Sequence, residues 1–341
     1  MFQVFAATPE DMGPGDIGVH AARAEAMGFT GLQVPDAIHD GLLLAAMALN
    51  ATSTLIVGTA VLVAFPRSPM TTAIAAWDLQ QMSGGRFEVG LGTQIKPNIE
   101  KRYAARWDSP VPQLREYVQG MKAIFHSFQT GERLNFEGEH YTLTKLQPFF
   151  NPGPIEHPDI PILCGAVGPA MTKMVGRIAD GMITHPTNTP PEYIRKVCLA
   201  RLQQGFDKAG RSGDDFKLIL GPLTATGKTE EAVAASWEKQ RNLLGFLYST
   251  PAYWPSLEMF GWQDKGQQLL DMTRQGSWQD MPNIVTDEML GKFVPRGTYD
   301  TIAQVFIDRY AGLTNRITFP LPDDPLEDEL VAEVVTKLKS A

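Results

Sequence analysis

The stretch WDLQQMSGGRFEVGLGTQ, Trp77 to Gln94, places a helix end, a tight turn, a strand and a glycine-rich exit within one short segment. Apolar residues recur at three- and four-residue spacings up to Met82, which predicts an amphipathic helix that stops at the SGG turn. The alternation from Arg86 to Leu91 then predicts a strand. A strand that ends in GTQ is typical of a strand end that faces a functional site.

The same order of strand, short loop and helix repeats along the chain. The run TLIVGTAVLV, from Thr54 to Val63, is nearly continuous in β-branched and apolar residues, as in a parallel strand buried on both faces. The last strand is expected at Arg316 to Pro320. Eight such units favour a (β/α)8 TIM barrel over a doubly wound sheet, with residues 1–341 as a single domain.

Two segments interrupt this rhythm and are predicted to be insertions. Residues of about 131–150 contain apolar positions that alternate around a Glu-Gly-Glu turn, which predicts a β-hairpin. Residues 248–292 are loop-rich in pattern and carry many aromatic side chains, so we expect a lid that roofs the substrate side of the site. The alternative is that the aromatic residues only anchor the insertion. The residues concerned are Tyr253, Trp254, Phe260, Trp262 and Trp278.

Composition excludes several classes of protein. A formal net charge of −8 and a pI near 5.3, with no cluster of basic residues, argue against a nucleic-acid partner. No apolar run approaches the roughly eighteen residues of a membrane span, and the N-terminus lacks a signal-peptide pattern. The two cysteines, Cys164 and Cys198, fit a reducing cytoplasm, where we expect the protein to reside. The six histidines lack ligand spacing, so we expect no metal.

In a TIM barrel the candidate site residues are those at the C-terminal ends of the strands. Strand two offers Asp36 and His39, strand four Gln94, and strand six His185. The fifth strand ends in CGAVGPAM, in which the Gly-Pro pair opens a helix and leaves backbone N–H groups free to bind an anion. An ordinary strand-to-helix turn is the alternative, and His185 has the alternative of a histidine that is simply hydrogen-bonded in place.

The segment LQQMSGGRFEVGLGTQ, preceded by IVGTAVLV and followed later by IADGMIT, resembles the bacterial luciferase-like monooxygenase superfamily, especially the branch that uses the deazaflavin coenzyme F420. The resemblance extends over about Met1 to Leu321 and implies a barrel with insertions. It also implies that Asp36 contacts the ring region and that Ala60 and Val61 form a non-prolyl cis peptide under the ring. The further cofactor contacts implied are Thr93, Gln94 and Asn98, and, in the turn that holds phosphate and ribityl groups, Gly165, Ala166, Val167, Gly168, Pro169, Ala170 and Met171.

The sequence also departs from part of that branch. The family's sugar-phosphate dehydrogenases have a histidine directly after the strand-two aspartate and an acid two residues beyond the GT pair. Here those positions are Ala37 and Ile95, so we do not expect a sugar phosphate as substrate.

The resemblance thus predicts an F420-dependent oxidoreductase that transfers a hydride between deazaflavin C5 and a small, rather apolar molecule. His39, His185 and Gln94 are the candidate proton donors or acceptors, and the histidines are expected to titrate near neutrality. The alternatives are an FMN-dependent monooxygenase on the same barrel and, in another class, a non-catalytic barrel used for binding. The remaining expectations are a homodimer built on early barrel helices such as the one with Trp77, and cofactor carboxylates bound by Lys96, Arg102 or Arg106.

Overall fold

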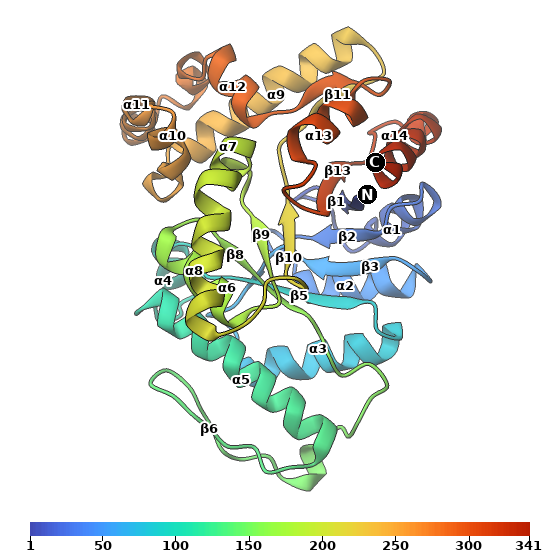
Figure 1. The fold of residues 1–341 in the computed structure, drawn as a ribbon, viewed down its shortest axis with the longest axis vertical. Helices are drawn as coiled ribbons and strands as arrows, with labels where there is room; N and C mark the ends of the chain where they lie inside the picture. Colours follow the sequence, from blue (N-terminus) through green and yellow to red (C-terminus); the bar gives the residue numbers. More distant parts are fainter.

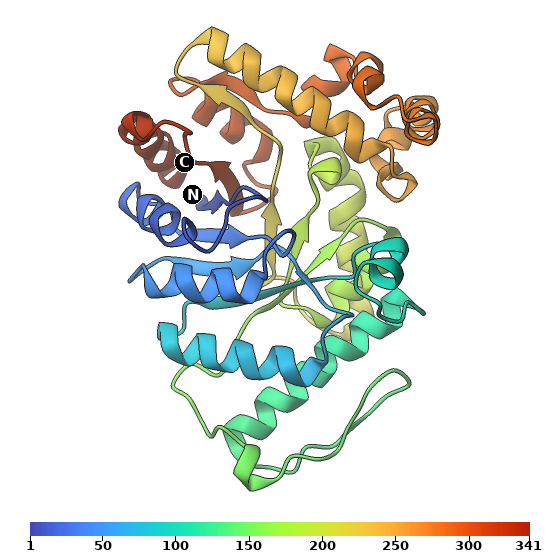
Figure 2. The same ribbon diagram turned by 180° about the vertical axis from the view of Figure 1, so that it is seen from behind.

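A closed barrel of eight parallel strands forms the centre of the protein in the computed structural model, which describes residues 1–341 (Figures 1 and 2). Neighbouring strands run in the order β3, β2, β1, β13, β10, β9, β8, β5, and pairing of β3 with β5 closes the ring. The predicted TIM barrel is therefore confirmed. The eight strands are β1 (Gln3–Ala7), β2 (Gly31–Val34), β3 (Ile56–Thr59), β5 (Phe87–Gly92), β8 (Ile162–Ala166), β9 (Gly181–Thr184), β10 (Lys217–Leu220) and β13 (Arg316–Pro320). A ninth, short strand, β4 (Leu62–Val63), follows β3 and pairs with the end of β5.

Helices surround the barrel and bury their apolar faces on it. Their packing with the strands forms a core of 64 buried residues between the sheet and the helical layer. None of the helices is both long and apolar enough to cross a bilayer. The helices of the barrel are α1 (Ile17–Ala26), α2 (Gly41–Asn50), α3 (Pro69–Ser83), α4 (Lys96–Lys101), α5 (Pro110–Thr130), α6 (Pro169–Ile178), α7 (Pro191–Tyr193), α8 (Leu199–Ala209), α9 (Glu230–Tyr248), α13 (Ile302–Tyr310) and α14 (Asp328–Ser340).

Helix α3, whose end lies in the stretch from Trp77 to Gln94, begins and ends at the predicted residues for the predicted reasons. The Ser68 side chain accepts a hydrogen bond from the Thr71 backbone N–H at the start of α3, and Gly84 ends the helix in the left-handed conformation at φ 64°. Trp77 is fully buried, and its indole Nε1 donates to the Gly153 carbonyl at 3.1 Å. Trp77 is therefore part of the core between α3 and α5, not of an outer surface.

The third strand lies within the predicted run from Thr54 to Val63, but the run is not one regular strand. It divides into β3 and β4, with a cis peptide between Ala60 and Val61, as the resemblance implied. The glycines of β5 make room for this break. A Cβ at Gly90 would lie 1.9 Å from the Thr59 carbonyl oxygen, and one at Gly92 would lie 2.4 Å from Val61 Cγ2. The GLG pattern is thus a packing requirement of the neighbouring strand.

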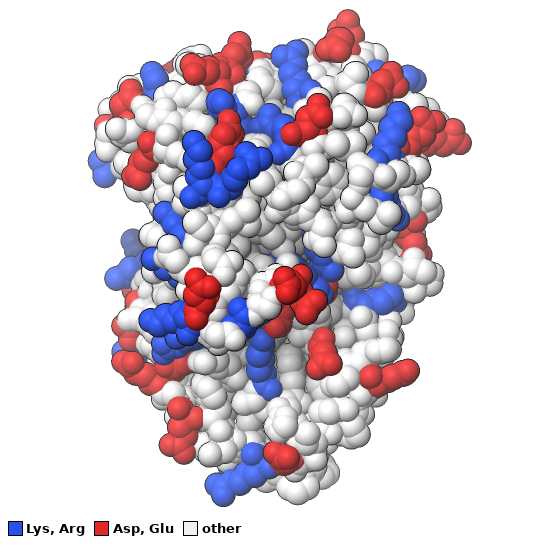
Figure 3. Space-filling view, viewed as in Figure 1, with Lys and Arg blue, Asp and Glu red and all other residues white.

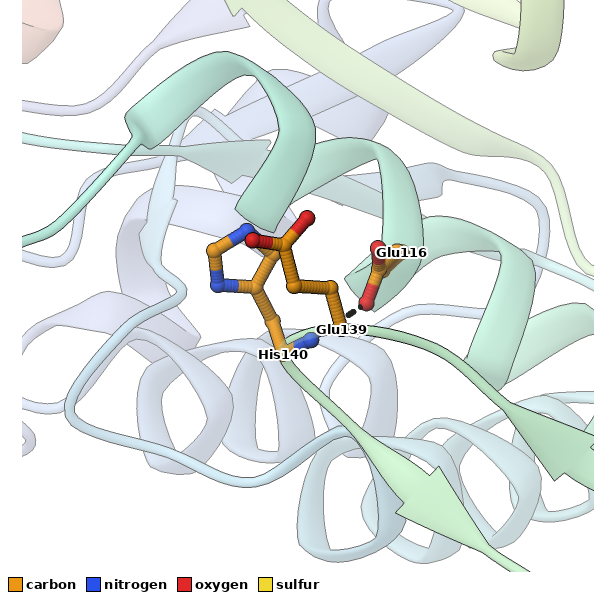
Figure 4. A group of neighbouring side chains, drawn as sticks. All are labelled: Glu116, Glu139 and His140. Atoms are coloured by element: carbon orange, nitrogen blue, oxygen red, sulfur yellow. Dashed lines mark hydrogen bonds between the residues drawn. The ribbon is translucent and has the colours of Figure 1, made fainter.

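The first insertion is a hairpin of β6 (Phe136–Glu137) and β7 (Thr142–Leu143), which lies along α5 at the lower end of Figure 1. A cluster of Glu116, Glu139 and His140 joins the two (Figure 4). The buried Glu116 carboxylate accepts a hydrogen bond from the His140 backbone N–H at 2.7 Å. Burial acts to raise the pKa of Glu116, but the backbone N–H groups of the turn outweigh it and lower that pKa. Glu116 therefore fastens the hairpin to α5.

The second insertion is mostly helical, so its prediction as loop-rich is wrong. Pro251 and Pro255 stand at the first positions of helical turns, where a missing N–H costs nothing, and do not break the segment. Its aromatic side chains pack on one another and on α9, in a second core separate from that of the barrel. A short parallel pair, β11 (Ala225–Gly227) with β12 (Arg296–Thr298), frames the insertion. Its helices are α10 (Pro255–Met259), α11 (Gln263–Gln275) and α12 (Asp287–Phe293).

Candidate functional site

The floor of the candidate site is apolar and lies at the C-terminal end of the barrel. Ala60 and Val61 pack on three barrel-interior side chains from β8, β9 and β10, namely Leu163, Ile183 and Ile219. A Cβ at Gly165 would lie 3.4 Å from Val61 Cγ1, so Val61 is in close contact with the ends of both β5 and β8. This arrangement provides an apolar surface beside the glycines at the ends of β5 and β8.

Asp36, after β2, is held by the protein itself. Its carboxylate accepts hydrogen bonds from the backbone N–H groups of Gly41 and Val63, both at 2.9 Å, and pairs with Arg67 at 3.0 Å. The Asp36 side chain is only 6% exposed, and Arg67 also pairs with Asp40 at 2.7 Å. Asp36 therefore joins the loops after β2 and β4, and its contact with a cofactor ring stays a prediction.

The turn after β8 has the chemistry of an anion site. Gly168 precedes α6 in an extended conformation with Pro169 at the first helical position, and Thr172 N–H donates to the Gly168 carbonyl. The N–H groups of Gly168, Ala170 and Met171 have no acceptor in the protein. Such a set of donors fits a phosphate group.

A neighbouring loop supports this turn. Asn188, which follows β9 and is 1% exposed, donates its side-chain amide to the Ala166 carbonyl at 3.0 Å. Its Oδ1 is buried without a hydrogen-bond partner. The site therefore retains an unsatisfied buried acceptor beside the donors of the turn.

The loop after β5 is organised around Gln94, which is exposed and has a positive φ of 60°. Its Oε1 accepts hydrogen bonds from the Ile95 backbone N–H at 3.0 Å and the Asn98 side chain at 3.1 Å. Thr93 donates to the Gln94 carbonyl at 3.1 Å. The structure thus brings the three predicted residues of this loop together, with the Gln94 amide oxygen already engaged within the loop.

His185 lies at the end of β9, face to face with Tyr253 from the second insertion, with ring centroids 4.1 Å apart and planes 12° from parallel. The Thr187 hydroxyl lies 2.7 Å from His185 Nδ1, and the Thr187 backbone N–H donates to the same nitrogen at 3.3 Å. Nδ1 is therefore the acceptor, and Nε2 carries the proton of the neutral ring. Burial lowers the pKa of His185 to about 4, so the expectation that it titrates near neutrality is wrong.

The other predicted proton carrier, His39, is partly buried beside the loop after β1, where a Cβ at Gly13 would lie 3.5 Å from its Nε2. No hydrogen bond links His39, His185 and Gln94 to one another. The loops that carry them do meet, since Arg102 in the loop after β5 donates to the Ala37 carbonyl after β2. The three side chains thus belong to one end of the barrel without forming a bonded triad.

Sequence reasoning missed two contacts of the site. Arg67 lies in FPRSP without any spacing signal that links it to Asp36, because the pair joins loops that are 31 positions apart. Tyr253 was expected to form part of a lid over the substrate side of the site, but its contact with His185 was not foreseen. The composition of the insertion could indicate that some aromatic residue lies near the C-terminal end of the barrel, but it could not indicate which residue.

We call the turn from Gly168 to Met171, with its free N–H groups, the donor turn. The closed barrel, the apolar floor and this donor turn together define a TIM-barrel protein with a candidate site at the C-terminal ends of its strands. The luciferase-like monooxygenase family profile matches residues 1–315. The chain belongs to this family.

Three proteins of known sequence are similar to the chain over much of its length. An uncharacterized protein of Mycobacterium tuberculosis is 39% identical over 297 residues, 87% of each chain. The 5,10-methylenetetrahydromethanopterin reductase of Archaeoglobus fulgidus is 27% identical over 299 residues, 84% of each chain. The F420-dependent glucose-6-phosphate dehydrogenase of Nakamurella multipartita is 34% identical over 230 residues, 63% of this chain and 65% of that protein. Of these three relatives, the two with a named activity are thus a reductase and an F420-dependent dehydrogenase.

Two solved structures share the fold. The coenzyme F420-dependent tetrahydromethanopterin reductase of Methanopyrus kandleri superposes with a TM-score of 0.80 at 20% identity, covering 99% of this chain and 98% of that one. The oxygenating component of 3,6-diketocamphane monooxygenase of Pseudomonas putida, solved with FMN, gives a TM-score of 0.65 at 14% identity and covers 99% of each chain. The barrel is thus shared by proteins of both cofactor types.

Proposed function

We propose that the protein is an F420-dependent oxidoreductase that transfers a hydride between deazaflavin C5 and a small, rather apolar organic substrate. The observation that carries the proposal is the donor turn at Gly168 to Met171 beside the apolar floor of Ala60 and Val61. The sequence relatives that use F420 support the choice of cofactor.

The residues present fit such a cofactor. The unpaired N–H groups of Gly168, Ala170 and Met171 would hold its phosphate, and the apolar surface of Val61 would lie under its ring. When bound, the deazaflavin supplies the hydride chemistry itself. The protein's part is to orient the ring, exclude water and present proton-bearing groups.

His185 is suited to the role of hydrogen-bond donor. Because Nδ1 accepts from Thr187, Nε2–H has no partner in the protein and is available to a substrate oxygen. A pKa of about 4 keeps the ring neutral at pH 7, so His185 would polarise or orient a carbonyl or hydroxyl and would not supply a full positive charge. The stacked Tyr253 fixes the plane of that ring.

A titration of the purified protein with F420, reduced F420 and FMN, followed by fluorescence quenching, tests the proposal. We expect F420 to bind more tightly than FMN. Tighter binding of FMN, with oxygen consumed once it is reduced, would support the monooxygenase alternative, which the FMN-bound neighbour makes a specific rival. Absence of binding by all three would favour a non-catalytic barrel.

We also propose that the protein forms a homodimer through α2 and α3. Large apolar side chains are exposed on both helices, and the helices contact one another. These residues are Leu43, Met47, Ile74 and Met82. A solvent-exposed apolar face of this kind is typical of a subunit interface. Sedimentation of the Ile74→Glu variant tests this proposal, with a monomer as the expected result.

A further inference from the structure

A cleft on the outer surface of the barrel is lined by basic side chains and by no acidic one. It has a volume of about 260 Å³ and lies between the start of α5, one face of α6 and the end of α8. Figure 3 shows basic side chains near the lower end of α8, with acidic side chains next to them. The basic residues of the lining are Arg115, Lys173, Arg177 and Lys208.

The geometry of α6 and α8 explains how these cations come together. Lys173 and Arg177 are four residues apart and therefore project from the same face of α6. Gly205 lets the two helices pack closely, since a Cβ there would lie 2.4 Å from the Lys173 carbonyl oxygen. Lys208, one turn beyond Gln204 on α8, borders the same cleft.

Three of the four cations of this cleft have no ion-pair partner in the protein. Lys173, Arg177 and Lys208 take part in no ion pair, and Arg115 reaches only the Glu116 carboxylate, at 3.4 Å. The first turns of α5 and α6, at Val111 and Ala170, also line the cleft and add the positive ends of two helix dipoles. Arg177 and Lys208 lie instead in the last turns of α6 and α8. In a chain of net charge −8, a cleft whose charged lining is entirely cationic favours an anion.

The cleft borders the donor turn of the candidate site, because Ala170 lines the cleft and also carries one of the free N–H groups of the turn. A ligand whose phosphate occupies the turn can therefore extend along α6 toward Lys173 and Arg177. The sequence analysis expected Lys96, Arg102 or Arg106 to bind the cofactor carboxylates, but two of these already form ion pairs within the protein. Lys96 pairs with Glu100 at 3.7 Å, and Arg106 with Asp108 at 3.4 Å.

We propose that this cleft binds the acidic tail of the deazaflavin cofactor, a chain of glutamyl carboxylates that follows the phosphate. The proposal rests on the proposed function, since it concerns the same cofactor. Carboxylates spaced along a flexible chain match separate lysine and arginine side chains, each of which forms a charge-assisted hydrogen bond. FMN carries the phosphate but no such tail, so the cleft would also distinguish the two cofactors.

The experiment compares F420 with several glutamates and the form that has none, by fluorescence-quenching titration at low and high salt. We expect the long-tailed form to bind wild type roughly tenfold more tightly at low salt, with the difference reduced by salt. In the Lys173→Glu, Arg177→Glu double variant the two forms should bind equally. The matched control, Lys239→Glu with Lys265→Glu on α9 and α11, changes the net charge equally and should behave as wild type.

Each outcome separates the two proposals. If wild type binds both forms with the same affinity, or if the double variant loses affinity for the form without glutamates as well, the tail site is overturned while F420 dependence stands. If Lys96→Glu with Arg106→Glu abolishes the tail effect and the α6 variant does not, the site lies on the β5 loop. If no form of F420 binds wild type, the proposed function itself fails.

Discussion

At the base of the barrel the Glu88 carboxylate lies between two cations, Arg316 at 2.9 Å and Lys217 at 2.7 Å. At the mouth, the C-terminal end of the strands, the backbone N–H groups of the turn after β8 have no protein partner. Glu88 and Arg316 are 5% and 6% exposed, and they come from β5 and β13 at the N-terminal ends of the strands. Two glutamines are exceptions at the base. The Gln33 amide, in the same layer as Glu88, has no partner, and neither has Gln3 Oε1, beside Arg316.

The difference separates residues that hold the barrel together from residues available to a ligand. The buried Glu88 and Arg316 neutralise each other, and the more exposed Lys217 adds a second ion pair to Glu88, so no ligand is needed to satisfy the buried charges. At the mouth, the turn after β8 and His185 Nε2 keep donors that only a ligand or solvent can satisfy. The comparison predicts that a substitution at the base lowers stability more than one at the mouth, and that a substitution at the mouth lowers cofactor or substrate affinity more.

The largest effect is expected for Glu88→Gln. This change leaves the buried Arg316 guanidinium without its counterion, and breaking such a pair costs about 3 kcal/mol of unfolding free energy. Denaturant unfolding measures the loss. The matched control is Glu100→Gln, which breaks the exposed pair with Lys96 and should change stability by less than about 0.5 kcal/mol. Equal effects in the two variants would contradict the assigned role of the base.

A smaller effect is expected at the mouth for Arg67→Gln. Asp36 would lose an ion pair but keep the N–H groups of Gly41 and Val63, so the cost should be about 1 to 2 kcal/mol. The loops after β2 and β4 would also loosen, so F420 affinity should fall more in this variant than in Glu88→Gln. An unchanged affinity would show that these loops do not shape the cofactor site.

The sequence predicted those parts of the structure that depend on local patterns. Ser68 and Gly84 mark the ends of α3 because capping and left-handed backbone are properties of single residues. Contacts between distant segments were not predictable in this way. The Lys217–Glu88 pair joins positions 129 residues apart, and only the closed barrel brings them together. The second insertion was misjudged because its prolines suit helix starts as well as loops.

The local features of the candidate site were predicted from the sequence, but the features that depend on contacts between distant segments were not. The turn from Gly165 to Met171 and the cis peptide at Ala60 and Val61 were found at the expected positions. The environment of His185 was not, because burial by Tyr253 from a distant segment sets its pKa. The basic cleft was also missed, since its cations lie on three helices.

A third prediction concerns pH. His185 has a folded-state pKa of about 4, below that of an unfolded histidine, so the unfolded chain binds more protons between these values. Its contribution to stability is therefore complete above about pH 7 and falls as the pH is lowered, by about 1 kcal/mol at pH 6. Unfolding measured from pH 7.5 to 5 should show a weaker pH dependence in His185→Gln. His20, whose pKa is also lowered by burial, accounts for part of the remaining slope. An unaltered slope in the variant would show that His185 is not buried as a neutral ring.

The smallest effect on stability is expected for Thr187→Val, which preserves the side-chain shape but removes the hydroxyl 2.7 Å from His185 Nδ1. The Thr187 backbone N–H still donates to that nitrogen, so the loss should be about 0.5 to 1 kcal/mol. For the same reason the proton should remain on Nε2, and ¹⁵N chemical shifts of the imidazole should report the same tautomer in both proteins. Substrate binding would then weaken only through a less well fixed ring. If the variant instead shows the proton on Nδ1, the hydroxyl and not the backbone sets the tautomer, and the donor role of Nε2 depends on Thr187.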